Sequence, residues 1–528
     1  MRFSLRLSKA DVTRNESKKS LFADHMKKLL PFCLVLITGS VCAQAATKEQ
    51  KNNPFAQTAE KIDLAKKYMT YIDSSDLRKH LTVLASEEYE GRETGKKGQQ
   101  LAAAYIQQSF KEDGCSYVPG MSEFQQTFEV IETTPGGTVT FGKKELAFKT
   151  DFVYMSAKRK VDLSQLPVYT LVTVPAEPTS DFVLIHALKG MDIRAELDEI
   201  RKNQSKKAKA IVLITTNYKD LYEYLEHNVT TKTMRLKDAP AKEEVPVILV
   251  RAEALAGTMN KKYAYLLGKE KEKKAKKGKQ LGLLTVKLNT EEAVLKSSNV
   301  LAYIPGSDPI LAKEVVVLTA HYDHIGIDDK GVVYNGADDD GTGTVALLEI
   351  AEAFMAAKRD GNAPRRSILI MTVSGEEKGL LGSSYYVNHS IVPLEKTIAD
   401  LNIDMIGRND IAHEKESDYV YIIGSNMLST DLHNTNEKAN ERYTQLNLDY
   451  KFNSKEDPNQ FYYRSDHYNF AKNNIPSIFY FSGIHEDYHQ PTDDIEKINF
   501  TKVEKVARLV FSTAWLLANG NQRPALDY

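Results

Sequence analysis

From Ser298 to the C-terminus, short apolar runs with the texture of buried strands alternate regularly with amphipathic helical segments. This alternation is typical of a mostly parallel sheet covered by helices on both faces, because each parallel crossover usually contains a helix. In the segment 343–357, for example, Leu347, Ile350 and Phe354 form one apolar stripe at helical spacing. Three helices are expected in this part of the chain, over residues 343–357, 429–440 and 502–518. The sequence therefore predicts an α/β fold.

Five side chains of the types that bind zinc each follow an apolar run of this kind. They are His321, Asp339, Glu377, Asp404 and His489. In open α/β sheets, ligands collect outside the carboxyl ends of the strands, so residues far apart in sequence can converge there. Zinc accepts both imidazole nitrogen and carboxylate oxygen as ligands. The pattern indicates a metallohydrolase.

The neighbours of these residues also suit metal chemistry. In His321-Tyr-Asp323, the carboxylate of Asp323 lies two residues after the histidine. It is placed to accept a hydrogen bond from the ring nitrogen of His321 that does not bind a metal. In Ser374-Gly-Glu-Glu-Lys, one glutamate can bind metal while its neighbour accepts a proton from bound water. The three acids after Asn335-Gly-Ala crowd like charges that a helix start and a metal pair would offset. A calcium-type loop is the alternative there, although the ligand spacing of an EF-hand is absent.

The N-terminus has the layout of a processing signal. Met26-Lys-Lys provides the positive region, residues 29–38 the apolar region, and Ala43-Gln-Ala45 the cleavage pattern. Residues 1–45 are therefore expected to be an upstream extension and signal peptide, with the true start at Met26 and export to the periplasm or the medium. A membrane anchor is the less favoured alternative, because the apolar run is shorter than the ~18 residues that span a bilayer.

The rest of the chain divides into three parts. Residues 58–117 are expected to begin the main domain, with two helices around a loop and Thr94 capping the second helix. Residues 118–297 have short β-rich runs, at 182–186, 210–214 and 245–250, and are expected to form an inserted α+β domain. Residues 298–528 then complete the main domain.

Composition narrows the possible partners. Lys and Arg number 70 against 71 Asp and Glu, so the net charge of -1 gives no general attraction to nucleic acid or anionic membranes. The run Lys269–Gln280 has no interleaved aromatic residue and is expected to be a solvated segment rather than a nucleic-acid site. After removal of the leader only Cys115 remains, which excludes an internal disulfide and a cysteine-based metal site.

Residues 298–500 resemble the zinc exopeptidase family that includes secreted bacterial aminopeptidases, glutamate carboxypeptidase and, more remotely, glutaminyl cyclase. Five motifs carry the resemblance: Ala320-His-Tyr-Asp-His, Gly336-Ala-Asp-Asp-Asp-Gly-Thr-Gly, Ser374-Gly-Glu-Glu-Lys-Gly-Leu-Leu-Gly-Ser, Asn402-Ile-Asp-Met-Ile-Gly-Arg and Asp487-Tyr-His-Gln-Pro-Thr-Asp-Asp. The segment 84–95 is similar to the family's opening segment. The insert resembles, less specifically, the protease-associated domain that many members carry.

The resemblance implies two zinc ions and a role for each residue of the site. Asp339 would bridge the ions, His321 and Asp404 would complete one zinc, and Glu377 and His489 the other. Glu376 would be the general base. Two further residues have less specific roles: Tyr488 would donate to the developing oxyanion, with packing as its alternative role, and Asp466 would accept a hydrogen bond behind the ligands, as would Asp323.

The expected function is that of an exported aminopeptidase that uses two Zn²⁺ ions to cleave N-terminal residues from peptides. A carboxypeptidase of the same fold is the nearest alternative and would need cations such as Arg408 or Arg464 to bind a terminal carboxylate. A glutaminyl cyclase-type acyltransferase would use one zinc. A binding protein without catalysis would lack ligands or a base, and this sequence has both.

Overall fold

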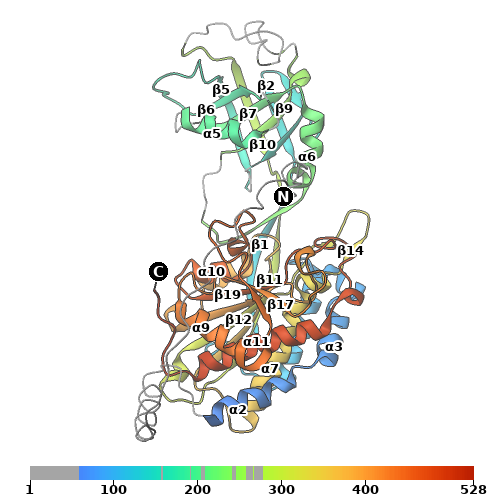
Figure 1. Ribbon diagram of the computed structural model, residues 1–528. Coiled ribbons are helices and arrows are strands. Elements are labelled where there is room, and N and C mark those ends of the chain that lie inside the picture. The colour runs from blue at the N-terminus through green and yellow to red at the C-terminus, as the bar shows by residue number, and fades with distance from the viewer. Residues whose placement is uncertain are drawn as a thin grey trace, which may run out of the picture. The chain divides into compact units, whose positions relative to one another are not determined.

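The computed structural model describes residues 59–527, except for 156–158, 189, 191, 204–207, 241–244, 257, 259–265 and 267–276 (Figure 1). By its contacts the chain divides into residues 1–53 and 54–528, and all described residues belong to the second unit. The expected signal peptide lies outside the described residues. Within the part that is described, no helix combines the length and the apolarity needed to cross a bilayer.

The main sheet has nine strands in the order β18-β17-β19-β16-β12-β15-β11-β1-β8. The bounds in chain order are β1 Gln125–Thr134, β8 Thr233–Leu236, β11 Glu291–Ile304, β12 Val315–His321, β15 Ser367–Val373, β16 Thr397–Ile403, β17 Tyr419–Ile423, β18 Asn447–Asp449 and β19 Ser477–Phe481. The four central strands, β15, β12, β16 and β19, are parallel to one another. Antiparallel strands lie on both sides of them, so the sheet is mixed around a parallel centre.

Helices cover both faces of this sheet. The bounds are α2 Ala59–Tyr68, α3 Ser74–Leu84, α4 Lys97–Glu112, α7 Gly343–Arg359, α8 Leu381–Asn388, α9 Thr430–Ala439, α10 His467–Ala471 and α11 Phe500–Asn519. Alternate residues of β12 enter two different cores: Val316 packs with α7 and α11, whereas Val317 packs with Tyr386 of α8 and Phe470 of α10. This two-sided burial explains the almost purely apolar strands, and it confirms the predicted α/β class.

A second sheet of eight strands has the order β3-β2-β10-β5-β6-β7-β9-β4. The bounds are β2 Gly137–Phe141, β3 Lys144–Leu146, β4 Phe152–Met155, β5 Val161–Tyr169, β6 Phe182–Ala187, β7 Ala208–Thr215, β9 Val247–Arg251 and β10 Gly282–Leu288, with helices α5 Ile193–Asn203 and α6 Tyr218–Thr230. The three strands expected from the sequence are β6, β7 and β9.

The second sheet spans fewer residues of the chain than the predicted insert, residues 118–297. It begins at β2 and ends at β10, because β1 and β11 belong to the main sheet. These two strands pair antiparallel from Gln125 opposite Val300 to Thr134 opposite Glu291. The short strand β8 also pairs with β1. The chain thus leaves and re-enters the main sheet along one long two-stranded ribbon.

The N-terminal helices α3 and α4 form as predicted, but Thr94 does not cap α4. That helix begins at Lys97 without a side-chain cap. The Thr94 hydroxyl instead donates to Oδ2 of Asp323 at 2.7 Å. A fully buried carboxylate without a donor is costly, so this long-range bond takes precedence over the local cap.

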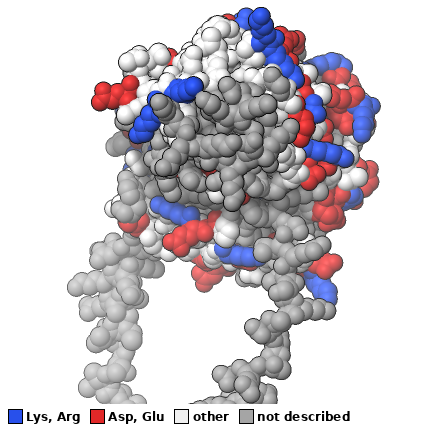
Figure 2. Space-filling view, turned by 90° about the horizontal axis from the view of Figure 1, so that it is seen from above, with Lys and Arg blue, Asp and Glu red and all other residues white. Residues whose placement is uncertain are grey.

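The surface charge is mixed over the face seen in Figure 2. Lys and Arg lie interspersed with Asp and Glu over the described part of that face. Most of the basic run Lys269–Gln280, up to residue 276, is not among the described residues. Its role as a solvated segment therefore stays a prediction.

Candidate metal centre

The five predicted ligands converge at the carboxyl edge of the parallel strands. His321 is the last residue of β12, and Asp404 directly follows β16. Glu377 lies in the loop after β15, and His489 in the loop after β19. Because β12, β15, β16 and β19 run parallel, their ends open on the same edge of the sheet. Asp339 reaches this edge from the loop that precedes α7.

One group of ligands forms around His321. Its Nε2 lies 3.3 Å from Oδ1 of Asp339 and 3.6 Å from Oδ1 of Asp404. The opposite ring nitrogen, Nδ1, donates to the backbone carbonyl of Asp323 at 3.0 Å, which turns Nε2 toward the carboxylates. Oδ2 of Asp404 accepts from the Ser465 hydroxyl at 2.8 Å. These three residues could hold one metal ion.

The second group uses the other oxygen of Asp339. Nε2 of His489 lies 3.1 Å from Oδ2 of Asp339 and 3.1 Å from Oε2 of Glu377. Asp339 therefore presents one carboxylate oxygen to each group, as a bridging ligand must. This is the arrangement that the resemblance implied for these residues.

The second group contains one residue that the sequence reasoning missed. Nδ1 of His324 lies 3.0 Å from Oε1 of Glu377 and 3.9 Å from Oδ2 of Asp339. His324, Asp339 and Glu377 could hold a metal ion together. A signal was present in the sequence, since His324 is the second histidine of the Ala320-His-Tyr-Asp-His motif.

The donor set fits a cation that accepts nitrogen and oxygen. Three of its buried atoms, Nδ1 of His324, Oδ2 of Asp339 and Oε1 of Glu377, have no hydrogen-bond partner among the described residues. Nδ1 of His324 and Oε1 of Glu377 lie 3.0 Å apart, and both residues belong to a group that could hold a metal ion. Zinc accepts both nitrogen and oxygen ligands.

Without metal, protons on the imidazoles balance the carboxylates. Burial alone would lower the pKa of His489, but Glu377 and Asp339 raise it to about 10. Burial and Asp339 both act to raise the pKa of Glu377, yet His489 and His324 bring it down to about 2. Metal binding must displace these protons, because a metal ligand is a neutral imidazole or an ionised carboxylate.

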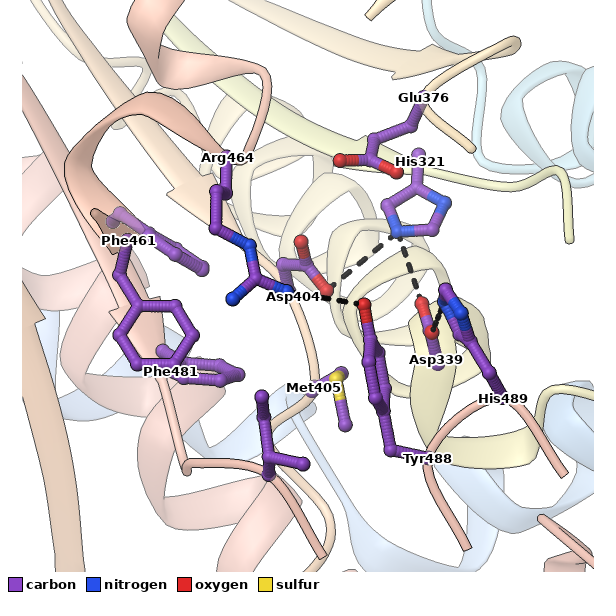
Figure 3. Close-up of a pocket in the computed structure, with 12 residues that line it drawn as sticks. His321, Asp339, Glu376, Asp404, Met405, Phe461, Arg464, Phe481, Tyr488 and His489 are labelled. Atoms are coloured by element: carbon purple, nitrogen blue, oxygen red, sulfur yellow. Dashed lines mark hydrogen bonds and ion pairs between the residues drawn. The ribbon is translucent and has the colours of Figure 1, made fainter. Parts of the chain in front are cut away.

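Glu376 stands beside the ligands without joining them. Its side chain lines the pocket together with His321, Asp339 and Asp404 (Figure 3). Its backbone N–H donates to Oδ1 of Asp323 at 3.2 Å. Burial raises the pKa of the Glu376 carboxyl well above its ordinary value, and the neighbouring carboxylates add to this effect although His321 opposes it. A carboxylate held in this way is suited to accept a proton.

Asp323 and Asp466 lie behind the ligands in different roles. The carboxylate of Asp323 binds the Thr94 hydroxyl and the Glu376 N–H, so His321 uses the carbonyl of Asp323 and not the expected carboxylate. Asp466 accepts from the Ser383 hydroxyl. Burial raises the pKa of Asp466 to about 7 against the opposing effect of His321. It makes no hydrogen bond to a ligand among the described residues.

Tyr488 faces the pocket beside the second group. Its ring stacks on His489 with the centroids 3.9 Å apart, and its hydroxyl lies 3.4 Å from Nη2 of Arg464. Burial, followed by the charges of Asp339 and Glu377, raises the pKa of the phenol well above its ordinary value. The hydroxyl is therefore protonated at neutral pH and is able to donate.

The opposite wall of the pocket is apolar. Met405, Phe461 and Phe481 lie on this side in Figure 3, and Phe479 and Ile484 also line the pocket. Such a wall accommodates a hydrocarbon or aromatic portion of a ligand while the acidic wall holds metal. The arrangement can therefore place a substrate group next to the candidate metal positions.

Buried hydrogen bonds fix the loop that carries Asp339. The Asp493 carboxylate accepts the backbone N–H groups of Asp338 and Asp339 at 3.0 and 3.1 Å. The buried guanidinium of Arg92 donates to the carbonyls of Asn335 and Gly336 at 2.7 and 2.8 Å. The loop is thus held from both sides before any metal binds.

Known proteins are similar in sequence to the part of the chain that carries the site. Residues 299–514 match the model of peptidase family M28. A probable leucine aminopeptidase of Arthroderma otae is 29% identical over 43% of this chain and 59% of its own length. Aminopeptidase YwaD of Bacillus subtilis is 28% identical over 40% of this chain and 43% of its own length. The chain thus spans about half the length of these curated relatives.

A solved structure shows the same fold. The aminopeptidase from Aneurinibacillus sp. strain AM-1 has a TM-score of 0.53 at 19% identity, over 88% of this chain and 98% of that chain. The resemblance inferred from the sequence motifs is confirmed.

Proposed function

We propose, on the premise that residues 299–514 belong to peptidase family M28, that this chain is a zinc-dependent aminopeptidase with two metal ions. The observation that carries the proposal is the shared carboxylate of Asp339, whose two oxygens face His321 and His489. Glu376 lines the pocket but belongs to neither group of metal ligands. The relatives that are named aminopeptidases support the same reaction class.

The residues of the pocket have separate tasks in peptide hydrolysis. Bound zinc lowers the pKa of water and polarises a carbonyl. Glu376 accepts a proton from the attacking water and returns it to the leaving amine, for which its raised pKa is suited. Tyr488 donates its hydroxyl hydrogen toward the developing oxyanion. The apolar wall holds the side chain of the residue that is removed.

The alternatives make different demands on the site. A binding protein without catalysis needs no general base, whereas Glu376 stands in the pocket here. A glutaminyl cyclase-type enzyme uses a single zinc, and two ligand groups that share Asp339 favour two ions. A carboxypeptidase needs a cation for the terminal carboxylate, and Arg464 lines the pocket. The carboxypeptidase is therefore the second candidate function.

A substrate panel tests the proposal. The purified chain, loaded with zinc, is assayed on aminoacyl-arylamides and on N-blocked dipeptides, with and without a chelator. We expect chelator-sensitive release of arylamine and no cleavage of blocked dipeptides. Cleavage of blocked dipeptides alone would establish the carboxypeptidase. No hydrolysis of either class at full metal occupancy would refute a peptidase function.

We further propose that the protein is exported and that its second sheet is a protease-associated domain. The leader pattern that ends in Ala43-Gln-Ala45 supports export. N-terminal sequencing of the extracytoplasmic protein should give Ala46 as the first residue. An N-terminus at Met1 or Met26 in that fraction would contradict cleavage at this site.

A further inference from the structure

A buried amide joins both ends of the loop that carries Glu376 and Glu377. Asn299, on β11, is fully buried and does not line the pocket. Its Oδ1 accepts the backbone N–H of Ser374 at 3.4 Å, and its Nδ2 donates to the Gly382 carbonyl at 2.9 Å. Ser374 directly follows β15, and Gly382 lies in the first turn of α8. One side chain therefore holds both the point where the loop begins and the point where it ends.

Hydrogen bonds inside the loop pass this restraint on to Glu376. The backbone N–H groups of Gly379 and Leu380 donate to the Glu376 carbonyl at 2.9 and 3.0 Å. The N–H of Leu381 donates to the Gly375 carbonyl at 2.8 Å. The loop is thus closed on itself, so its orientation depends on what its two ends are attached to.

A second amide extends the contact to the far end of α8. Gln126 lies directly opposite Asn299 in the pairing of β1 with β11. Nδ2 of Asn299 also donates to Oε1 of Gln126 at 3.0 Å, and Nε2 of Gln126 donates to the His389 carbonyl, just after α8, at 3.0 Å. With both N–H groups and the oxygen of Asn299 engaged, the orientation of its amide is fixed. The ribbon of β1 and β11 therefore holds α8 at both ends.

Glu376 depends on this restraint more than Glu377 does. Oε2 of Glu377 lies 3.1 Å from Nε2 of His489, and its Oε1 lies 3.0 Å from Nδ1 of His324, so contacts from other loops fix it. Among the residues that the structure describes, the carboxylate of Glu376 has no hydrogen-bond or ion-pair partner. The backbone of the loop alone sets where this carboxylate lies.

We propose that Asn299 is a positioning residue for the general base, because its amide holds the loop so that the Glu376 carboxylate faces the pocket. The inference rests on the proposed aminopeptidase function, in which Glu376 moves the proton. A displacement of about 1 Å can cost a factor of about 100 in rate, even when the altered residue lies far from the chemistry. Since Asn299 does not line the pocket, it acts on turnover rather than on the binding of substrate.

The first test uses the zinc-loaded full chain of Asn299→Ala with an aminoacyl-arylamide. We expect kcat to fall by about tenfold to a hundredfold, while KM and metal content stay within about twofold of the wild type. Asn436→Ala is the matched control, because Asn436 is also a fully buried asparagine of the main domain. Its Oδ1 accepts the hydroxyls of Tyr480 and Thr513, away from the loop. The control should keep its kcat.

Two further measurements serve if Asn299→Ala does not fold. In Gly382→Ala, the added Cβ would collide with Oδ1 of Asn299 and with the Ser374 carbonyl, so it opens the same contact from the side of the loop. We expect the same fall in kcat for this variant. Hydrogen exchange followed by mass spectrometry needs no variant: the amide of Ser374 should exchange slowly in the wild type, because its N–H is bound to Asn299.

Each result has a distinct meaning. A kcat within about twofold of the wild type in Asn299→Ala or Gly382→Ala, at equal metal content, would overturn the inference and leave the aminopeptidase intact. An equal loss of kcat in Asn436→Ala would also overturn it, because the loss would then follow from general destabilisation. Exchange at Ser374 as fast as in an exposed loop would show that the amide does not hold the loop. If the wild type hydrolyses no arylamide at full zinc occupancy, the proposed function fails, and the inference fails with it.

Discussion

At the scale of single residues, two adjacent glutamates, Glu376 and Glu377, have different positions in the site. Glu377 faces His489 and His324. Glu376, its neighbour in the chain, lines the pocket and belongs to neither group of metal ligands. The loop after β15 therefore presents one carboxylate to metal and the next one to substrate. The same adjacency made the pair recognisable from the sequence.

We predict that Glu376→Gln keeps its metal and loses most of its turnover. The amide has the same shape but cannot accept a proton, and general base catalysis contributes typically a factor of about 100 to 10,000. The measurement is kcat on an aminoacyl-arylamide together with metal content by mass spectrometry. Wild-type activity in a fully loaded variant would remove Glu376 from this role.

We predict that His324→Ala weakens metal binding at the second group by at least about tenfold, since its imidazole faces Glu377 and Asp339. Competition with a chromogenic chelator measures the affinity. His467→Ala is the control, because His467 is also a fully buried histidine but packs against the Phe479 ring. Unchanged affinity in the His324 variant would contradict a ligand role.

At the scale of elements, strand direction explains why the ligands were predictable. A residue that ends a parallel strand has a known place at one sheet edge, so His321 and Asp404 could be placed from local pattern alone. The helix expected over 343–357 is present as α7 Gly343–Arg359. By contrast, the pairing of β1 with β11 and the bond from Thr94 to Asp323 join segments far apart in sequence. No local pattern encodes such contacts, so the pairing of β1 with β11 was not predicted and the expected cap at Thr94 was wrong.

Helix α11 carries a buried amine, Lys502, from which the pH dependence of the free energy of unfolding can be predicted. Lys502 donates to the Arg408 carbonyl and to Oδ1 of Asn409, and its Nζ lies 3.6 Å from the centre of the Tyr419 ring. Burial lowers the pKa of Lys502 from 10.5 to about 7. Between these two pH values the unfolded chain binds a proton that the folded chain does not, so the free energy of unfolding rises with pH.

We predict that the wild type gains stability relative to Lys502→Met as the pH rises from 7 to 9. The expected gain is about 1 kcal/mol per pH unit, because the variant lacks the titrating amine. Urea unfolding at both pH values measures the difference. A difference that does not change with pH would show that Lys502 stays charged in the folded protein.

At the scale of the whole molecule, the proposed ions would cross-link the carboxyl ends of four adjacent parallel strands of the main sheet and the loops that follow them. The ligands come from segments after β12, β15, β16 and β19. A metal bound to the folded state alone stabilises that state by mass action.

We predict that removal of zinc lowers the unfolding temperature of the protein by several degrees. A ligand at about 100 times its dissociation constant contributes about 2.7 kcal/mol to the free energy of unfolding. Differential scanning calorimetry with and without chelator, followed by zinc addition, measures the change. The same unfolding temperature in both forms would show that no metal binds the folded chain tightly.

The most direct test of the account is a crystal structure with anomalous scattering recorded at the zinc edge. We predict two peaks on opposite sides of the Asp339 carboxylate, one next to His321 and Asp404 and the other next to Glu377 and His489. A single peak, or peaks away from Asp339, would contradict the shared metal centre on which the proposed function depends.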